Sequence, residues 1–485
     1  MNAHRWLSFS LLLTFIVLTA GTKARPITAS QSQDFPSIIL VSRNSDGVPG
    51  DDNSGQPSVS ADGRFVAFGS VANNLADDEI ASTNVFVRDL QTGQTELVSR
   101  HSNGAAADAD SYAPSLSADG RYVAFDSFAA NLVDDDTVQC DPYCRNVFVH
   151  DLQTGETTLV SRNSAGEPGN GPSGSADISA DGRYVAFTSN AGNLAEGDDA
   201  FCGDTKCFQV FVHDRLTGET SVVSRSTDGE LGNGHSYPPV ISADGRFLAF
   251  TSLATNLTDD MIEDCDGNVV VDQCSSIFVH DRQTGETTIV TRGPDGESAN
   301  GESDNPALSA DGRYVAFDSW ADNLTHDDTQ LCGEINRYSC HDVFVHDRQT
   351  GRTVLVSRHS DGAPGMADSS VPSLSADGRY ITFVSKDYTL GTRIIPYGYG
   401  IVFRDLVLGT TTMIFAGSYE DFTGSPSISS GGRFVVFQTY SGSLVSDDSI
   451  RCHDLTGMNS CADVFLYDHG PVDHFAAYTP LLAAP

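Results

Sequence analysis

The chain has 485 residues, with 65 Asp and Glu against 28 Lys and Arg and a formal net charge of −37 at pH 7. This length is enough for two or three average domains or for one large repetitive domain. Nucleic acid and anionic membrane surfaces bind basic patches, so the charge argues against both and favours cations or basic ligands. A simpler account, in which the charge keeps an exported protein soluble, stays open.

Residues 1–24 are typical of a secretory signal peptide. A short polar start with His4 and Arg5 precedes a mostly apolar run from Trp6 to Ala20. This run is shorter than the roughly 20 apolar residues that a membrane span needs, and small residues follow it. We therefore expect a secreted or periplasmic protein, a leader over residues 25–37 and no membrane span in the chain.

One phrase recurs along the rest of the sequence. The eleven residues SADGRYVAFDS occur at 117–127 and again at 309–319, and related copies make seven in all. The copies begin at residues 60, 117, 179, 242, 309, 375 and 429. A period of this size, filled with short apolar runs and turn residues, indicates a propeller or solenoid of repeated β units.

Each repeat predicts four strands. In the second repeat they are PSLS (114–117), RYVAFDS (121–127), NVFVHD (146–151) and ETTLVSR (156–162), with Asp-Gly and Thr-Gly as tight turns. The seventh repeat has a third strand at 464–468 but no fourth, and SIILVSR at 37–43 matches the fourth strands. We predict an all-β, seven-bladed β-propeller of four-stranded blades over residues 38–468. Its N-terminal strand closes the ring, and a tail over 469–485 follows.

The repeat pattern resembles the TolB-type propeller repeat, which is a WD-repeat-like family. The pattern is P-x-[LIV]-S-x-D-G-R-x-[VIL]-[AT]-F-x-S followed by [VI]-F-V-x-D-x-x-x-G, over roughly residues 38–468. The resemblance implies a propeller but no single function, because binding proteins, peptidase propellers and lyases carry similar repeats. TolB has an α/β domain before its propeller, whereas only the short leader precedes the first strand here. TolB's own partners are therefore not implied.

An arginine begins the second strand of every repeat and an aspartate ends the third. Antiparallel pairing places these two positions at the same edge of the sheet, so we predict a structural Arg–Asp ion pair in each blade. The row of His150, His213, His280 and His346 lies on four different blades, and we interpret it as structural packing rather than a metal site. The predicted pairs are Arg64–Asp89, Arg121–Asp151, Arg183–Asp214, Arg246–Asp281, Arg313–Asp347, Arg379–Asp405 and Arg433–Asp468.

All ten cysteines fall in the loops between the second and third strands. Each of five loops holds two, and an exported protein favours disulfides, so we predict pairing within each loop. Zinc is the rival interpretation, although a tetrahedral site would require two loops to meet. The predicted pairs are Cys140–Cys144, Cys202–Cys207, Cys265–Cys274, Cys332–Cys340 and Cys452–Cys461.

The same loops are rich in aspartate. In the fourth repeat, the segment DCDGN places Asp264, Asp266 and Asn268 at alternate positions, which is a pattern that calcium sites use. Its glycine lies at the fourth position rather than at the sixth position of an EF-hand loop. Solvated acidic loops are the alternative, so calcium is the one cofactor that the sequence raises, and none is certain.

The sequence contains neither G-x-S-x-G nor H-E-x-x-H, and it offers no coherent catalytic set. We predict a non-catalytic binding or scaffold module, a monomer, that holds a protein or glycan ligand on its acidic, disulfide-pinned loop face. The alternative is a carbohydrate-active lyase or hydrolase with a site at the central channel mouth. The sixth repeat lacks both the cysteine pair and the aspartate pair, and its Tyr388, Tyr397 and Tyr399 predict a distinct contact surface. Aromatic packing across the loop is the alternative.

Overall fold

The computed structural model describes residues 37–76, 82–134, 144–197, 201–202, 205–259, 274–327, 331–332, 338–387, 389–391, 398–417, 423–441, 444–445 and 461–471. One compact unit, Phe35–Pro485, contains all of them. The predicted signal peptide and most of the leader and tail lie outside the described residues. Within the described ranges, no helix is long and apolar enough to cross a membrane.

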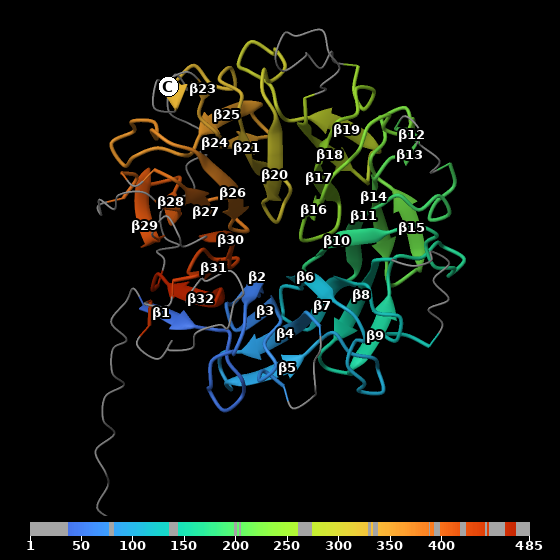
Figure 1. The fold of residues 1–485 in the computed structure, drawn as a ribbon. Helices are drawn as coiled ribbons and strands as arrows, with labels where there is room; N and C mark the ends of the chain where they lie inside the picture. The colour runs from blue at the N-terminus through green and yellow to red at the C-terminus, as the bar shows by residue number, and fades with distance from the viewer. Residues whose placement is uncertain are drawn as a thin grey trace, which may run out of the picture. The chain divides into compact units, whose positions relative to one another are not determined.

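Seven four-stranded antiparallel sheets, which we number as blades 1 to 7, form the fold (Figure 1). Blades 1 to 3 are β2–β5 (Ser54–Val59, Phe65–Ser70, Asn84–Asp89, Gln94–Leu97), β6–β9 (Ser111–Leu116, Tyr122–Ser127, Asn146–Asp151, Glu156–Leu159) and β10, β11, β14 and β15 (Ser173–Ile178, Tyr184–Ser189, Gln209–Asp214, Glu219–Val222). Blades 4 and 5 are β16–β19 (Val240–Ile241, Phe247–Ser252, Ser276–Asp281, Glu286–Ile289) and β20, β21, β24 and β25 (Ser303–Leu308, Tyr314–Ser319, Asp342–Asp347, Arg352–Leu355).

Blade 6 is β26–β29 (Ser369–Leu374, Tyr380–Ser385, Gly400–Asp405, Thr410–Ala416), and blade 7 joins β30–β32 (Thr423–Ile428, Phe434–Thr439, Asp463–Asp468) to β1 (Ser37–Leu40). Two small hairpins complete the described strands. They are β12 and β13 (Phe201–Cys202, Thr205–Lys206) and β22 and β23 (Leu331–Cys332, Tyr338–Ser339).

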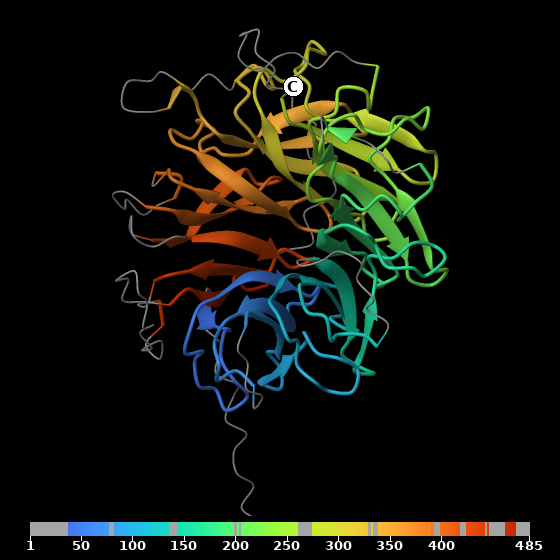
Figure 2. The ribbon, with the colours of Figure 1, turned by 45° about the vertical axis from the view of Figure 1, so that its right-hand side comes forward.

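The ring closes at blade 7, as the sequence predicts. Strand β1 pairs antiparallel with β32, and Ile38 lies opposite Tyr467. The first strands also contact one another in a full circle, from β2 through β6, β10, β16, β20, β26 and β30 back to β2 (Figures 1 and 2). The prediction of a seven-bladed propeller closed by the N-terminal strand is confirmed.

A β-bulge interrupts the first strand of six blades. The bulge residue lies seven positions before the turn glycine and has a φ between 49° and 56°, in the left-handed region. Blade 4 carries Pro238 at this place, and a proline ring holds φ near −65°. Its first strand is accordingly cut to Val240–Ile241. The six bulge residues are Gln56, Ala113, Ser175, Asn305, Val371 and Ser425.

The core consists of seven apolar clusters, each shared by two neighbouring blades. Val147 of blade 2 and Phe187 of blade 3, for example, belong to one cluster. Within six of the blades, the phenylalanines of the second and third strands stack, as Phe68 and Phe86 do with ring centroids 5.9 Å apart. Because the second and third strands are buried on both faces, a blade buries its apolar surface only between two others.

Candidate functional site

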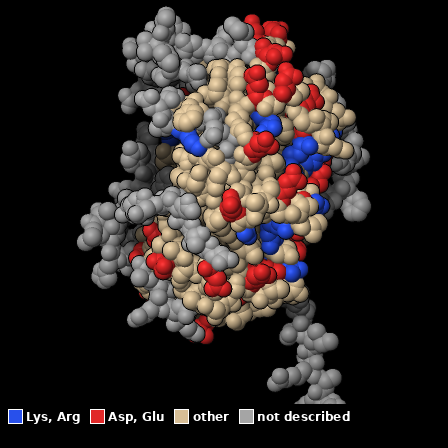
Figure 3. Space-filling view, turned by 90° about the vertical axis from the view of Figure 1, so that its right-hand side faces the viewer, with Lys and Arg blue, Asp and Glu red and all other residues tan. Residues whose placement is uncertain are grey.

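The turns divide the propeller into two faces. The Asp-Gly turns between first and second strands and the Thr-Gly turns between third and fourth strands lie on one face, which we call the tight-turn face. The loops between second and third strands and between blades lie on the other, which we call the long-loop face. On the flank drawn in Figure 3, acidic side chains gather at the upper edge and are interspersed with basic ones below.

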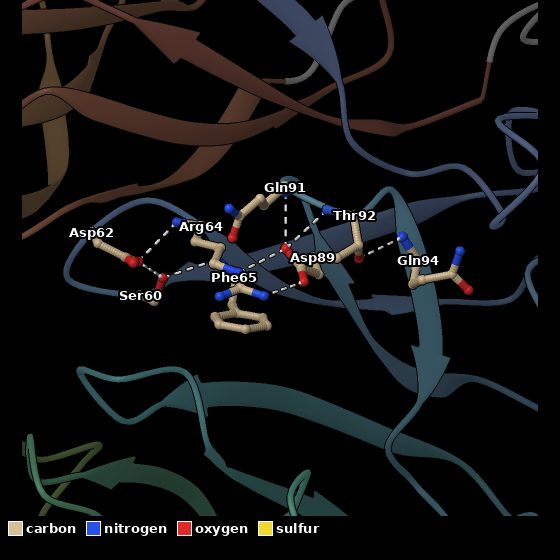
Figure 4. Close-up of polar contacts among 8 residues, drawn as sticks. All are labelled: Ser60, Asp62, Arg64, Phe65, Asp89, Gln91, Thr92 and Gln94. Atoms are coloured by element: carbon tan, nitrogen blue, oxygen red, sulfur yellow. Dashed lines mark hydrogen bonds and ion pairs between the residues drawn. The ribbon is translucent and has the colours of Figure 1, made fainter. Parts of the chain in front are cut away.

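The structure brings all seven predicted Arg–Asp pairs together on the tight-turn face, with N–O distances of 2.6 to 2.8 Å. In blade 1, Arg64 Nε and Nη2 donate to the two carboxylate oxygens of Asp89 (Figure 4). In blade 2, the hydrogen bond from Arg121 lowers the pKa of Asp151 to about 2. These carboxylates also accept backbone N–H groups of the following turn, which accounts for their repetition on structural grounds.

Replacing Arg379 by alanine is expected to lower the free energy of unfolding by roughly 2 kcal/mol, because a nearly buried carboxylate loses its charged partner. The Arg379 and Asp405 side chains are only 10% and 7% exposed, whereas Arg64 is 39% exposed. Arg64→Ala should therefore cost less, since water replaces the guanidinium. Urea unfolding of both variants tests this ranking, and equal losses would contradict it.

The turn aspartate has a local role. Asp62 accepts hydrogen bonds from Ser60 Oγ at 2.7 Å and from the Arg64 N–H at 2.9 Å, and Ser60 Oγ in turn accepts the Phe65 N–H (Figure 4). Asp119 makes the same bonds in blade 2. The residue therefore shapes the hairpin and needs no ligand to explain it.

Each turn glycine packs on an aromatic ring of the preceding blade. A Cβ added to Gly120 would lie 2.2 Å from the Phe65 ring, and one added to Gly182 would lie 2.2 Å from the Tyr122 ring. The phrase DGR[FY] therefore supplies both halves of a blade-to-blade contact. The pairs are Gly63 on Phe434, Gly120 on Phe65, Gly182 on Tyr122, Gly245 on Tyr184, Gly312 on Phe247, Gly378 on Tyr314 and Gly432 on Tyr380.

The four histidines of the third strands each contact a threonine of the fourth strand. His150 Nδ1 lies 2.9 Å from Thr157 Oγ1, and this hydroxyl donates to the Arg100 carbonyl of the preceding blade. The other three make the same contact with a threonine of their own blade. Arg88 takes this place in blade 1 and bonds the equivalent Thr95. Among the described residues, no group of three or more His, Cys, Asp or Glu could hold a metal ion.

Of the predicted cysteine pairs, the structure shows Cys202–Cys207 as a disulfide. In the other four predicted pairs, three cysteines, Cys140, Cys265 and Cys452, lie outside the described residues. Cys332 ends strand β22. The four others, Cys144, Cys274, Cys340 and Cys461, are also disulfide-bonded.

The remaining predicted site residues fall mainly in undescribed loops. The calcium candidates Asp264, Asp266 and Asn268 all lie outside the described residues, as do Tyr388 and Tyr397. The third tyrosine of the predicted contact surface is described. The Lys386 ammonium lies 5.5 Å from the centroid of the Tyr399 ring, and Lys386 also pairs with Asp368 at 2.9 Å.

Blade 5 holds a polar and aromatic cluster at the long-loop face. Asp318 is fully buried, and it accepts the Val371 N–H of blade 6 at 2.6 Å and Asn305 Nδ2 at 3.0 Å. His341 Nε2 lies 3.1 Å from the other carboxylate oxygen. The Trp320 indole stacks on the His341 ring with centroids 4.6 Å apart. The carboxylate thus joins two blades and fixes an aromatic surface above them.

Sequence reasoning missed this cluster, although the repeated phrase carries its signal. Asp318 is the tenth residue of SADGRYVAFDS, and Asp126 of blade 2 is its counterpart. Comparing the copies at this one place would have singled out both carboxylates. The other blades have Gly69, Thr188, Thr251, Val384 and Gln438 there.

Asp126 is also fully buried, and its only charged contact among the described residues is Arg145. Arg145 Nε lies 2.8 Å from Asp126 Oδ2, and the guanidinium lies against Gly174 of blade 3. Burial raises the pKa of Asp126 to about 6, although Arg145 opposes the shift. Like Asp318, this carboxylate lies where two blades meet at the long-loop face.

Exposed aromatic side chains gather on one side of the propeller. Among the described residues, Phe128, Phe201, Tyr237 and Trp320 are the exposed ones, at 39%, 58%, 42% and 41%. Phe128 and Trp320 follow second strands, Tyr237 precedes a first strand, and Phe201 lies in the hairpin of the Cys202–Cys207 disulfide. All four therefore lie on the long-loop face.

No protein-family model matches the chain, and no curated protein matches it. Among solved structures, an oligogalacturonate lyase in complex with manganese is similar at 14% identity and a TM-score of 0.51, over 89% of this chain and 96% of that one. A TolB from Acinetobacter baumannii matches at 17% identity and a TM-score of 0.34, over 65% and 62%. An acylaminoacyl peptidase from Pyrococcus horikoshii matches at 12% identity and a TM-score of 0.48, over 86% and 51%. At 14% identity, the match to the oligogalacturonate lyase shows a shared propeller fold and no more.

Proposed function

We propose that the protein is an exported, non-catalytic binding module that holds a protein or glycan ligand on its long-loop face. The observation that carries this proposal is the position of the exposed aromatic side chains, all four of which lie on that face. Aromatic residues contribute large rigid contact areas to binding sites, and a few polar groups beside them orient the ligand. Trp320, stacked on His341 and held by Asp318, is the anchor we expect to contribute most.

The polar side chains near this face favour binding over catalysis. Gln438 accepts the Gln56 N–H of the next blade at 2.6 Å, and Gln56 accepts the Ala113 N–H at 3.1 Å. Arg145 is paired with Asp126 of its own blade, and its guanidinium lies against Gly174 of blade 3. Side chains that hold blades together are poorly placed to move protons on a substrate, since catalysis requires groups that reach the reacting atoms.

Replacing Trp320 by alanine is expected to weaken ligand binding about tenfold or more, because the substitution removes the stacked surface. Leu216 is the matched control, since it is 74% exposed but lies in a turn of the tight-turn face. Leu216→Ala should bind as the unchanged protein does. The measurement is binding to an array of neutral and acidic oligosaccharides, with and without calcium, followed by titration of each hit.

Two outcomes would contradict the proposal. Loss of binding in Leu216→Ala but not in Trp320→Ala would place the ligand on the tight-turn face instead of the long-loop face. Cleavage of any polysaccharide on the array, detected as new reducing ends or unsaturated products, would replace the binding proposal by the carbohydrate-active alternative.

A further inference from the structure

Three gaps between blades on the tight-turn face are filled by an arginine. Arg215 of blade 3 lies over the Tyr122 ring of blade 2, with its guanidinium carbon 4.5 Å from the ring centroid. Arg215 Nη1 also donates to the carbonyl of Gly182, the turn glycine of its own blade, at 2.6 Å. Arg282 and Arg348 repeat both contacts in the next two gaps. The chain therefore builds one guanidinium site three times.

Carboxylates lie close enough to act electrostatically on two of these guanidinium groups, Arg215 and Arg348. Asp151 and Glu156 of blade 2 act on Arg215 in this way. Asp281, Glu286 and Asp311 do the same for Arg348. The recurrent site thus consists of an aromatic ring, a turn-glycine carbonyl and two or three acidic side chains, which together suit a planar cation that stacks and donates hydrogen bonds.

The gap between blades 1 and 2 has the same parts but a different residue at the arginine position. Leu152 follows Asp151 there, as Arg215 follows Asp214. A cavity of about 570 Å³ lies at this place, and its lining includes Phe65, Asp89, Glu96, Asp119, Gly120 and Leu152.

The lining matches the filled sites residue by residue. Phe65 takes the place of Tyr122, and Gly120 takes the place of Gly182, with φ values of 72° and 73°. Asp89 and Asp119 correspond to the carboxylates of the filled sites. Gln94 replaces the outer-strand glutamate, but Glu96, two residues on in the same strand, supplies a carboxylate instead. Arg64 also stacks on Phe65, at 4.6 Å, as Arg121 stacks on Tyr122 at 4.7 Å beside Arg215. A second guanidinium on such a ring is therefore compatible with the first.

We propose that this cavity binds an arginine side chain of a partner protein, in the position that Arg215 occupies in the next gap. Three carboxylates line the cavity, and one of them, Asp89, is paired with Arg64. Arg121 is paired with Asp151 outside the lining, so the charges of Glu96 and Asp119 favour an incoming cation. The net charge of −37 favours approach of a basic partner. The site lies on the face opposite the proposed ligand surface, so it is a second binding function.

The test uses the peptide Gly-Gly-Arg-Gly-Gly, with blocked ends, titrated into the whole protein and followed by NMR. We expect saturable shifts of the amides around Phe65 and Gly120. The same peptide with lysine in place of arginine should bind at least fivefold more weakly, because an ammonium group cannot stack and donate along a plane. Free arginine is a third probe. Binding as tight as that of the peptide would assign the site to a small molecule and overturn the proposal.

Leu152→Arg is the decisive variant, because it supplies the guanidinium from within the chain. It should abolish peptide binding and leave the melting temperature unchanged or higher. Leu406→Arg is its matched control, because Leu406 follows Asp405 in blade 6 as Leu152 follows Asp151 in blade 2. The gap at Leu406 differs in charge, since the outer strand of blade 5 carries the basic Arg352 at the position of Gln94 in blade 1. That variant should bind the peptide as the unchanged protein does.

Glu96→Gln gives an independent test that does not depend on how Leu152→Arg folds, because the Glu96 side chain is exposed. It should weaken peptide binding about threefold, whereas Glu219→Gln, next to a gap already filled by Arg282, should not change it. Unchanged binding in both Leu152→Arg and Glu96→Gln, or equal binding of the arginine and lysine peptides, would overturn the proposal.

Discussion

Replacing Gly182 by alanine is expected to lower the free energy of unfolding by roughly 3–4 kcal/mol, whereas the same change at Gly155 should cost only about 1 kcal/mol. Both glycines have a φ of 73°, so both substitutions strain the backbone equally. They differ in surroundings. The new Cβ at Gly182 would lie 2.2 Å from a carbon of the Tyr122 ring, but nothing lies within 4 Å of the one at Gly155.

The difference between the two variants measures the blade-to-blade contact. Urea unfolding at pH 7 gives both free energies, and the slope of each transition reports whether the unfolding unit has changed. If the two variants lose the same amount, backbone conformation alone explains the turn glycine and the aromatic contact contributes nothing. Because the contact recurs in all seven blades, its strength bears on how firmly the ring holds together.

The repeats predicted the blades well because the residues that define each strand and turn lie close together in the chain. Asp-Gly and Thr-Gly turns, short apolar strands and a missing fourth strand are all visible within one period. The Arg–Asp pairs were also accessible, since pairing of the second and third strands places Phe65 opposite Asp89 and so brings Arg64 beside that carboxylate.

The contacts between blades were not predicted, because no local spacing encodes them. Gly120 meets Phe65 across 55 residues of sequence, and the Val371 N–H reaches Asp318 across 53. Such contacts are visible only once the ring is built. The residues of greatest functional interest, Trp320 and Leu152, are also those that depart from the repeat, and a pattern built on what the copies share passes over them.

The two faces of the propeller therefore differ in which residues vary from one repeat to the next. On the tight-turn face, a few side chains vary from gap to gap, and the gap with Leu152 in place of arginine contains a cavity. On the long-loop face, whole loops differ, and they carry the disulfides and the exposed aromatic residues. One ring thus carries a small proposed site on one face and a broad surface of variable loops on the other.

Acidification is expected to weaken the fold through the four histidines of the third strands, three of them buried and His346 part-buried. Burial lowers the pKa of His150, His213, His280 and His346 from 6.5 to about 4. A group with a depressed pKa in the folded state contributes stability that is present above pH 6.5 and is lost as the pH falls through 4. Each shift corresponds to about 3 kcal/mol over this window. For His150, Nδ1 already faces Thr157, and Nε2 is buried with no hydrogen-bond partner among the described residues, so a second proton would have no acceptor.

The chain supplies a control for this effect. Arg88 and Arg404 occupy the same place in blades 1 and 6 and bond the equivalent threonines, and they keep their charge at every pH in the window. His150→Arg should therefore lose about 3 kcal/mol less than the unchanged protein between pH 6.5 and pH 4. Asp126 and Asp342 act in the opposite sense, because burial raises their pKa to about 6, but they are common to both proteins and cancel in the comparison.

Urea unfolding between pH 6.5 and pH 4 gives the stability of each protein against pH, and NMR titration gives the histidine pKa values directly. Parallel curves, or a His150 pKa near 6.5, would show that protonation of this histidine does not oppose folding.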